Sequence, residues 1–566
     1  MRAEIQSHRY TAHVDTFCAD HMPLPEQLPQ IFRDLPEYAC PERVNCAAEL
    51  LDRIVENGGG ERTAFIHESG RWTYRRMLET ANRIAHVLID DLGLVTGNRV
   101  LLRGPNHPML VACWFGVIKA GGIAVTTACL LRCRELLSIA DAAQIRLALC
   151  DARYADDCEE AFSRHADGTP RQEATVVRFN TTAGESEQQI PHYARDNKFG
   201  SLESLMGTKS PDFPNCDTSC EDVAILAFTS GSTGRGKGTL HTHRDIVASA
   251  DCFPRHALCP LPEDIFIGTP PLAFTYALGG LLIFPMRSGA ATVLLEQTSP
   301  KHLLEGIARH RATVCFTAPT ADRAMLKELT REQTASLRKC VSAGETLPLS
   351  TFEAWEQATA LKIIDGIGST EMLHIFISAP EDEIRPGATG KPLRGYEAKI
   401  LRADGSDADC GEVGRLAVRG ITGCKYLDNE EEQRKYVQNG WNLTGDSFRV
   451  DKDGYFWFQA RTDDLIVSSG YNISGVEIEN VLLEHPAVQE CAVIGVANSD
   501  RGQIVKAFIV TRPEHAACDA LKKELQDFVK AQIAPYKYPR ALEFVSSLPR
   551  TNTGKLQRYQ LREQSR

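Results

Sequence analysis

A loop of small and hydroxyl residues follows a short apolar run in the first half of the chain. The run is Ile225-Leu226-Ala227-Phe228, and the loop is Thr229-Ser230-Gly231-Ser232-Thr233-Gly234-Arg235-Gly236-Lys237-Gly238. A strand that breaks into glycines and hydroxyls offers backbone N–H groups to an anion, and the lysine adds a positive charge. Together these groups predict a site for the phosphates of a nucleoside triphosphate.

The same loop matches the spacing of a P-loop from Gly231 to Lys237. In a P-loop the residue after the lysine is Ser or Thr, because its hydroxyl holds Mg²⁺. Here that residue is Gly238, and the hydroxyls precede the lysine. We therefore expect a phosphate-binding loop of another kind, while a surface loop without a ligand stays open on these residues alone.

Four further stretches place polar residues where a fold alone does not require them. In residues 365–371 an apolar run again breaks into glycines, and the carboxylate of Glu371 is suited to Mg²⁺. Asp446 follows a turn, where an acid suits a ribose diol, while Arg461 lies where the sequence changes character and Lys555 lies on a loop near the chain end. Each also has a simpler explanation. Residues 365–371 could be a strand-to-helix turn with a solvated Glu371, Asp446 could serve only its turn, Arg461 could belong to a linker, and Lys555 to a basic tail.

Composition excludes several classes of protein. The chain has 566 residues, of which 43% are hydrophobic and 24% charged, as in a soluble globular protein of more than one domain. A formal net charge of −11 argues against nucleic acid as the main partner, because nucleic-acid binders need basic surface. The 18 cysteines include no C-x-x-C pair. Cys216 with Cys220, or His241 with His243, lacks the second pair that a metal site requires.

No segment has the pattern of a membrane or export signal. The N-terminus lacks the apolar core of a signal peptide. The longest uncharged stretch, between Asp264 and Arg287, could span a bilayer by length but contains Pro270, Pro271 and Pro285. A buried, turn-rich segment explains it better, so we expect no membrane span and a cytoplasmic protein.

The first 460 residues alternate between strand and helix patterns. We expect a hairpin over residues 63–74, a strand over 99–102 and a helix over 109–120. This alternation predicts α/β layers around a largely parallel sheet. An irregular excursion is expected over residues 164–221, and a strand over 312–316.

The pattern changes after Arg461. The spacing of Ser474 and Glu477 is that of a capping box, which predicts a helix that ends before Pro486. Residues 488–510 should form two strands, and a later helix should bury one face formed by Leu521, Leu525, Phe528 and Val529. A separate small α+β domain is therefore expected.

The ordered set of five motifs resembles the adenylate-forming superfamily of acyl-CoA synthetases, adenylation domains and luciferases, over essentially the whole chain. This resemblance implies an α/β fold with a large N-terminal domain of several subdomains, residues 1–460, and a small mobile α+β domain, residues 461–566. It implies two half-reactions. A carboxylate and ATP give acyl-AMP and pyrophosphate, and a thiol then displaces AMP.

A narrower resemblance concerns the acid. Gly366-Ile367-Gly368-Ser369-Thr370-Glu371-Met372-Leu373-His374-Ile375-Phe376 is similar to benzoate-CoA ligases. Thr11-Ala12-His13-Val14-Asp15-Thr16-Phe17 and Asn45-Cys46-Ala47-Ala48-Glu49-Leu50-Leu51-Asp52 look like 2-aminobenzoate-CoA ligases. An aromatic acid, ATP, Mg²⁺ and CoA are the ligands that follow from it.

The resemblance also assigns site residues at matching positions. Those for ATP and AMP are Thr229, Ser230, Gly231, Ser232, Thr233, Gly234, Lys237, Gly344, Asp365, Gly366, Ile367, Asp446 and Arg461. The catalytic residues are Lys555, Thr370 and Glu371, and Glu371 is also the Mg²⁺ ligand. The hinge is Asp463, and the CoA tunnel is lined by Ser468, Ser469, Gly470 and Tyr471. The acyl pocket is formed by Phe274, Tyr276, Ala343, Gly368 and His374, with His374 either a donor to an ortho substituent or a satisfied core histidine.

Two positions depart from the superfamily pattern. Gly236 stands where a proline-like residue is usual, which puts the affinity for ATP in doubt. Ile367 replaces an aromatic ring expected beside adenine, although the benzoate subgroup shares this isoleucine. We read Ile367 as a subgroup trait.

Other functions stay open on the sequence. A fatty acyl-CoA ligase, or an adenylation enzyme that loads a carrier protein, would use the same motifs. A P-loop-like ATPase or kinase would release ADP, and a nucleotide-binding module without catalysis is a further alternative. The exact acid, the pathway and the oligomeric state are also left open, a homodimer included.

Overall fold

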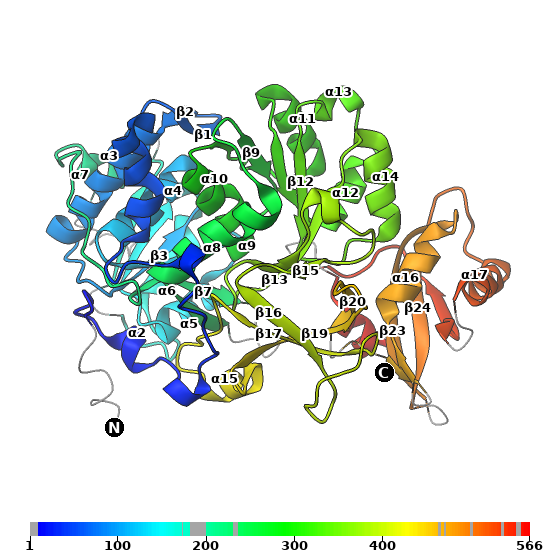
Figure 1. Cartoon of the computed structure of the whole chain (residues 1–566). Helices are drawn as coiled ribbons and strands as arrows, with labels where there is room; N and C mark the ends of the chain where they lie inside the picture. The colour runs from blue at the N-terminus through cyan, green and yellow to red at the C-terminus, as the bar shows by residue number, and fades with distance from the viewer. Residues whose placement is uncertain are drawn as a thin grey trace.

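The computed structural model describes residues 10–171, 174–181, 200–229, 236–461, 464, 466–468, 471–498, 502–533, 537–550 and 556–565. Within these residues the strands form four sheets, and Figure 1 shows them as a large body with a smaller unit beside it. The smaller unit is the orange and red C-terminal part of the chain.

The first sheet has the strand order β6-β5-β3-β4-β7-β8. Its strands are β3 (Arg99–Arg103), β4 (Ile123–Thr127), β5 (Leu147–Asp151), β6 (Thr175–Phe179), β7 (Val223–Thr229) and β8 (Lys237–Thr242). All neighbours are parallel except β7 and β8, which are antiparallel.

The prediction that residues 164–221 form an irregular segment is therefore wrong in part. β6 joins the sheet because Val176, Val177 and Phe179 are buried, and α7 (Leu202–Met206) follows it.

The second sheet has the order β15-β14-β13-β12-β11-β9-β10-β1-β2. Its strands are β1 (Thr63–His67), β2 (Gly70–Thr73), β9 (Ile265–Gly268), β10 (Ala291–Val293), β11 (Val314–Thr317), β12 (Lys339–Ala343), β13 (Ile363–Gly368), β14 (Ile375–Ser378) and β15 (Lys391–Pro392). The hairpin of β1 and β2 is confirmed, although Tyr74 already begins a helix. β11 begins at Val314 and not at Ala312, whose N–H bonds back to the carbonyl of Ile307 at the end of a helix.

Helices cover and separate these two sheets. In α4 (Pro108–Lys119) every residue is buried, as is typical of a helix enclosed on all sides. It packs against α3 (Tyr74–His86), and Gly116 permits the close approach, because a Cβ there would lie 2.6 Å from Ile84 Cγ2. The other α-helices of this part are α2 (Phe17–Asp20), α5 (Cys133–Ala142), α6 (Ala155–Ser163), α8 (His243–Phe253), α9 (Thr275–Ala277), α10 (Phe284–Ser288), α11 (Pro300–His310), α12 (Pro319–Met325), α13 (Arg331–Thr334), α14 (Leu349–Thr359) and α15 (Glu430–Tyr436).

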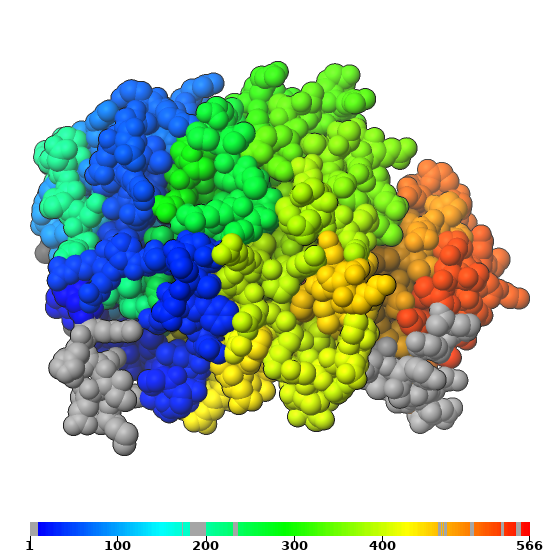
Figure 2. Space-filling model, in the orientation of Figure 1, coloured from blue at the N-terminus to red at the C-terminus, as the bar shows by residue number. Residues whose placement is uncertain are grey.

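The third sheet is antiparallel and joins the large body to the N-terminal segment. Its strands are β16 (Tyr396–Leu401), β17 (Gly414–Gly420), β18 (Val437–Gln438), β19 (Trp441–Val450) and β20 (Phe456–Arg461). The backbone N–H groups of Gln30 and Phe32 donate to the carbonyls of Gly440 and Gly420, each at 2.9 Å. Figure 2 shows the result, with the blue N-terminal segment lying against the yellow and lime part of the surface.

The fourth sheet belongs to the small C-terminal unit. It contains β21 (Ile466–Ser468), β22 (Tyr471–Ile473), β23 (Val488–Asn498), β24 (Gly502–Thr511) and β25 (Ala541–Phe544), with helices α16 (Gly475–Glu484), α17 (Asp519–Gln532) and α18 (Arg558–Gln564). The hydroxyl oxygen of Ser474 accepts from the Glu477 N–H at 3.2 Å, so the predicted helix start is confirmed. Leu521, Leu525 and Val529 pack into a separate core.

The expected fold class is confirmed, with a large α/β N-terminal domain and a small α+β C-terminal domain. Throughout the described ranges, no helix reaches the length and apolarity that crossing a membrane requires.

Candidate active site

The carboxyl ends of β12 and β13 form one wall of the candidate site. The two strands are parallel, with Ser342 opposite Asp365 and Ala343 opposite Gly366. Their ends therefore meet at one edge of the sheet, where ligands bind in α/β proteins. Gly344 follows β12 with a φ of +89°, a backbone conformation that favours glycine.

Residues 369–374 form a tight turn from β13 into the antiparallel strand β14. This differs from the strand-to-helix turn that served as the simpler explanation of residues 365–371. Gly368 makes the turn possible, because a Cβ there would lie 2.5 Å from the His374 carbonyl oxygen. The chain reverses directly, and Thr370, Glu371 and His374 are held on one short segment.

Glu371 is fixed by a tyrosine from a distant part of the chain. The hydroxyl of Tyr426 donates to Glu371 Oε1 at 2.7 Å. One residue earlier, the carbonyl of Thr370 accepts from His241 Nε2 at 2.8 Å, where a carbonyl can only accept. Glu371 remains half-buried. A carboxylate with free oxygen lone pairs at the edge of a cleft is the kind of ligand that Mg²⁺ takes beside substrate phosphates, so the side chain fits the predicted role.

Lys237 reaches the same tyrosine from β8. Its ammonium forms an ion pair with Glu432 on α15 and lies 5.8 Å from the centre of the Tyr426 ring. Thr229 is the direct partner of Lys237 across the β7–β8 pair. The structure thus brings Lys237 and Glu371 to Tyr426, with Thr229 beside Lys237. Five residues of the predicted phosphate loop, Ser230, Gly231, Ser232, Thr233 and Gly234, lie outside the described residues.

Asp446 and Arg461 lie opposite each other on β19 and β20. Arg461 Nη1 donates to Asp446 Oδ1 at 2.8 Å. Burial raises the pKa of the Asp446 carboxyl, and the Arg461 guanidinium opposes this rise. A buried carboxylate with one oxygen held by arginine can accept hydrogen bonds from a sugar diol through its other oxygen.

A cluster of aromatic rings surrounds His374, which lies in the turn between β13 and β14. His374 is 5% exposed, and its ring centre lies 4.5 Å from that of Phe284 and 5.6 Å from that of Tyr276. Phe253 and Phe316 complete the cluster. Gly279 leaves the room that the imidazole occupies, because a Cβ there would lie 2.2 Å from His374 Cδ2.

The two ring nitrogens of His374 differ in their hydrogen bonding. Nε2 lies 3.1 Å from the Tyr276 carbonyl oxygen, so it carries the proton and donates. Burial lowers the pKa of His374 to about 3, and the neutral ring therefore keeps a bare lone pair on Nδ1. This Nδ1 is buried and has no hydrogen-bond partner. The expectation that His374 donates to a ligand, or is a fully satisfied core histidine, is corrected: the free atom is an acceptor.

The remaining acyl-pocket residues lie around this cluster. Ala343 is buried at the end of β12, and Gly368 is exposed at the end of β13. Tyr276 belongs to α9 and donates through its hydroxyl to the Thr317 carbonyl at 2.9 Å. Phe274 precedes α9 and is half-buried. Phe253, Phe284 and Phe316 were missed by the sequence reasoning, because nothing in a single sequence separates them from other core phenylalanines.

The residues predicted for CoA and for domain motion are described in part. Ser468 is buried in β21, and Tyr471 begins β22. Asp463, Ser469, Gly470 and Lys555 lie outside the described residues. Arg550, five positions before Lys555, donates to the Thr320 hydroxyl at 3.3 Å and to Glu490 at 2.8 Å. These bonds tie the C-terminal segment to α12 of the large domain.

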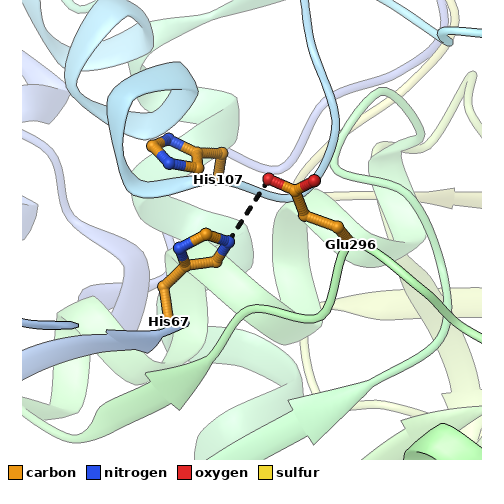
Figure 3. A group of neighbouring side chains, drawn as sticks. All are labelled: His67, His107 and Glu296. Carbon is orange, nitrogen blue, oxygen red and sulfur yellow. Dashed lines mark ion pairs between the residues drawn. The ribbon is translucent and has the colours of Figure 1, made fainter. Parts of the chain in front are cut away.

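A group of two histidines and a glutamate, shown in Figure 3, has the residue types of a metal site. His67 Nε2 lies 3.3 Å from Glu296 Oε1, with His107 beside them. Backbone N–H groups donate to the Nδ1 atoms of both rings, from Ser69 at 3.1 Å and from Met109 at 3.0 Å. Each neutral ring therefore carries its proton on Nε2, and neither offers a lone pair to a cation.

Arg153 completes the explanation of this group. Its guanidinium donates to both oxygens of Glu296, at 2.6 and 3.0 Å. The Glu296 carboxylate is thus surrounded by donors. We interpret His67, His107 and Glu296 as a polar cluster, with the Glu296 carboxylate held by Arg153, that joins β1, the start of α4 and the segment after β10.

Comparison with known proteins gives consistent matches. The chain matches the AMP-binding enzyme family over residues 51–425 and the AMP-binding enzyme C-terminal domain over residues 477–555. It is 34% identical to a benzoate–CoA ligase of Thauera aromatica over 93% of this chain and 97% of that protein. It is 30% identical to the mitochondrial acyl-coenzyme A synthetase ACSM3 of Homo sapiens over 92% and 90% of the two chains.

One solved structure is similar over nearly its whole length. The crystal structure of the anthranilate CoA ligase AuaEII in complex with anthranoyl-AMP has a TM-score of 0.85 and 33% identity. The match covers 94% of this chain and 99% of that chain.

Proposed function

Because the chain belongs to the family of AMP-binding enzymes and is an AMP-forming acid–CoA ligase, we propose that its acid is an aromatic carboxylic acid with 2-aminobenzoate as the first candidate. The acid is converted to acyl-AMP and then to the aryl-CoA thioester, with release of pyrophosphate and AMP. The alternative of a P-loop-like ATPase or kinase is set aside with the family match.

The observation that carries the proposal is the free Nδ1 of His374. A buried acceptor without a partner costs on the order of 1–3 kcal/mol. An amino group on the aromatic ring donates an N–H to this atom, whereas benzoate and an alkyl chain offer it nothing. The surrounding rings of Phe284 and Tyr276 suit a flat substrate. The similarity to a structure that contains anthranoyl-AMP supports the ortho position of the amino group.

The first half-reaction gathers negative charge at the α-phosphate as the carboxylate attacks. Positive charge and oriented donors are therefore what the protein supplies. In the proposal Lys237 and Thr229 hold phosphate oxygens, and Asp446 holds the ribose. Thr370 contacts the α-phosphate, and Lys555 holds the attacking carboxylate. Bound Mg²⁺, held by Glu371, would neutralise phosphate charge.

The second half-reaction requires the thiol of CoA to reach the acyl-AMP. In the proposal the small domain rotates about Asp463, which removes Lys555 and brings Ser468 and the residues after it to the pantetheine. In the proposal the contact between Arg550 and Thr320, which joins the two domains, belongs to the first arrangement, whereas the contact between Arg550 and Glu490 lies within the small domain.

The test is a substrate panel with the purified protein, ATP, Mg²⁺ and CoA. The acids are benzoate, 2-aminobenzoate, 3-aminobenzoate, phenylacetate, and short, medium and long fatty acids. We expect stoichiometric aryl-CoA and AMP, with the highest kcat/KM for 2-aminobenzoate, at least about tenfold above benzoate if the buried hydrogen bond is formed. Products are followed by chromatography and mass spectrometry.

Other outcomes assign a different function. A preference for fatty acids would support the alternative that the similarity to an acyl-coenzyme A synthetase suggests. Acyl-AMP without thioester would indicate a carrier protein as the acceptor. Equal rates with benzoate and 2-aminobenzoate would leave an aryl-CoA ligase and contradict the role given to His374.

A further inference from the structure

Two cysteines meet where the N-terminal segment crosses the entrance to β7. The Cys220 N–H donates to the Glu42 carbonyl at 2.9 Å, and Arg43 pairs with Ser219 in an antiparallel bridge. This pairing brings Cys40 and Cys220 to the lining of the same cavity, where the two thiols are close enough to influence each other's ionisation. Both residues are half-buried, and they lie 180 positions apart in the chain, so only the fold brings them together.

The surroundings of the pair favour a thiolate on Cys220. The interaction with Cys40, helped by the charges of Arg244 and Arg33, lowers the pKa of Cys220 to about 7, although burial and the Glu221 carboxylate oppose this shift. The two arginines are held in place by Glu221, which accepts from Arg33 at 2.6 Å and from Arg244 at 2.6 Å. A thiolate is the form of cysteine that reacts with oxidants.

The pair is also accessible. Cys40 and Cys220 line an open cavity of about 320 Å³, together with Arg33 and Arg244. A small oxidant can therefore reach the sulfur atoms from solvent. Elsewhere most thiols are enclosed, and in Cys216, four residues before Cys220, burial raises the pKa to about 11.

A metal ion does not explain the pair. Among the described residues, the one group of three or more histidine, cysteine or carboxylate ligand atoms close enough for an ion is that of His67, His107 and Glu296. Cys40 and Cys220 thus have each other as neighbours without a third ligand. Two neighbouring thiols, one of them ionised and accessible, form a redox pair and not a metal site.

We propose that Cys40 and Cys220 form a reversible oxidation site for hydrogen peroxide or an organic hydroperoxide. The Cys220 thiolate attacks the peroxide, an S–O bond forms as the O–O bond breaks, and the leaving hydroxide takes a proton to become water. Cys40 sulfur then attacks the Cys220 sulfenic acid, the S–S bond forms, and the hydroxyl leaves as water with the proton of Cys40. Two thiols and one hydrogen peroxide give one disulfide and two waters, or one water and one alcohol when the oxidant is an organic hydroperoxide, and a thiol reductant restores the pair.

The disulfide would tie two segments that the fold already holds together. Cys220 lies three residues before β7, which ends at Thr229, and Cys40 lies in the N-terminal segment. Oxidation would therefore anchor the start of the strand that leads into the predicted phosphate loop. The site is independent of the acid that the enzyme activates, so the substrate panel and the experiment below test different claims.

The experiment treats the reduced full-length protein with hydrogen peroxide at pH 7, blocks remaining thiols with N-ethylmaleimide and maps peptides by mass spectrometry. Cys216 and Cys220 share one tryptic peptide, residues 210–235, so fragmentation assigns the linked cysteine and Cys216 is an internal control. We expect a Cys40–Cys220 linked peptide that dithiothreitol removes. Cys220 should react about tenfold faster than the exposed Cys410 and Cys518, because about half of it is thiolate at pH 7.

Single variants separate the two steps. In Cys40→Ser the sulfenic acid on Cys220 should persist and be trapped by dimedone. In Cys220→Ser no linked peptide should form, and Cys40 should be oxidised no faster than Cys410, because in the proposal Cys40 reacts only with the sulfenic acid on Cys220. Far-UV circular dichroism and ligase activity of the reduced variants check that they fold. Absence of the linked peptide in the folded wild-type protein, or oxidation of Cys220 no faster than of Cys410, would overturn the proposal.

Discussion

In the proposed function, His374 determines which polar group the aromatic pocket can satisfy. Its proton is held on Nε2 by the Tyr276 carbonyl, and its lowered pKa keeps the ring neutral over the whole physiological range. Recognition therefore depends on one lone pair in an apolar enclosure. A ligand that donates to this atom gains a hydrogen bond, and a ligand that cannot donate leaves the acceptor buried and unpaired.

Replacing His374 by phenylalanine tests this role at a single atom. The substitution keeps a ring of similar size in the cluster and removes the Nδ1 acceptor. We expect kcat/KM for 2-aminobenzoate to fall about 10- to 100-fold, corresponding to the loss of one buried hydrogen bond. For benzoate the value should change by less than about threefold, because benzoate makes no bond to Nδ1. Steady-state kinetics with both acids give the ratio.

A second variant checks that the effect comes from the acceptor. His374→Asn keeps an oxygen near the place of Nδ1 and should recover part of the preference for 2-aminobenzoate. An equal loss of activity with both acids in His374→Phe would show a structural role in the pocket, and the assigned hydrogen bond would then be wrong.

At this scale the sequence predicted some site residues and could not reveal others. Glycine breaks in residues 229–238 and 365–371 mark backbone that must turn sharply, and such breaks are visible in one sequence. Tyr426 could not be predicted in this way. It contacts Glu371 only because the fold places residues 424–427 beside β8, with a bridge between Thr239 and Tyr426. No local pattern distinguishes it from other tyrosines.

Between elements, a chain of hydrogen bonds joins the C-terminal segment to the wall of the nucleotide site. Arg550 donates to Glu490 on β23 and to the Thr320 hydroxyl at the start of α12. The Thr320 hydroxyl donates in turn to Glu345 at 2.6 Å, and Glu345 follows Gly344, one of the residues predicted for ATP and AMP. The segment that precedes Lys555 is thus bound to the start of α12, and through Thr320 it is connected to Glu345 beside the candidate site.

We predict that Arg550→Ala slows acyl-AMP formation by about tenfold and changes thioester formation from supplied acyl-AMP by less than about twofold. Loss of a charge-assisted hydrogen bond network of this size costs on the order of 1–3 kcal/mol. The loss falls on the first step, because it loosens the segment that carries Lys555. Pyrophosphate release and CoA transfer are measured separately.

A double-mutant cycle with Thr320→Val provides the control. Thr320→Val removes the same hydrogen bond from the other partner, together with the bond from Thr320 to Glu345. The loss in the double variant should therefore be smaller than the sum of the two single losses. Fully additive losses would show that the contact between Arg550 and Thr320 does not act as a unit, and equal loss in both half-reactions would contradict its assignment to the first.

Local signals were sufficient for elements whose boundaries are set by their own residues. The β1–β2 hairpin and the capped start of α16 follow from a turn and a cap that lie within a few residues. The turn after β13 was not predicted, because whether Gly368 leads into a helix or reverses depends on β14 pairing back onto β13. β6 was likewise hidden, since its polar flanks resemble a loop until the sheet supplies a neighbour.

Over the whole molecule, the interior holds several titratable groups in their neutral forms. Burial lowers the pKa of His107 and His241 to about 4 and that of His243 and His374 to about 3. Burial also raises the pKa of the carboxyls of Asp322 and Asp365 to about 7. These groups are spread over both large sheets, so their combined effect belongs to the stability of the large domain.

The two sets oppose each other as the pH falls from 6.5 to 5. The unfolded histidines, with a pKa near 6.5, bind protons that the folded histidines do not bind, so acid destabilises the fold through them. The folded carboxyls bind protons in this window and the unfolded ones do not, so acid stabilises the fold through them. Four histidines against two carboxyls leave the unfolded state with about 1.7 more protons at pH 5.5, which corresponds to about 2 kcal/mol per pH unit.

We therefore predict that the melting temperature of the large domain falls by several degrees between pH 6.5 and 5 and changes little between pH 7.5 and 8.5, as followed by calorimetry. Two variants should change the slope in opposite directions. His243→Phe removes a group that binds a proton only when unfolded, and should flatten the fall. Asp322→Asn removes a carboxyl that resists it, and should make the fall steeper by a similar amount. The prediction would be wrong if the melting temperature rose on acidification, or if the slope changed in the same direction in both variants. Either result would show that these buried groups do not determine how the stability of the large domain depends on pH between 6.5 and 5.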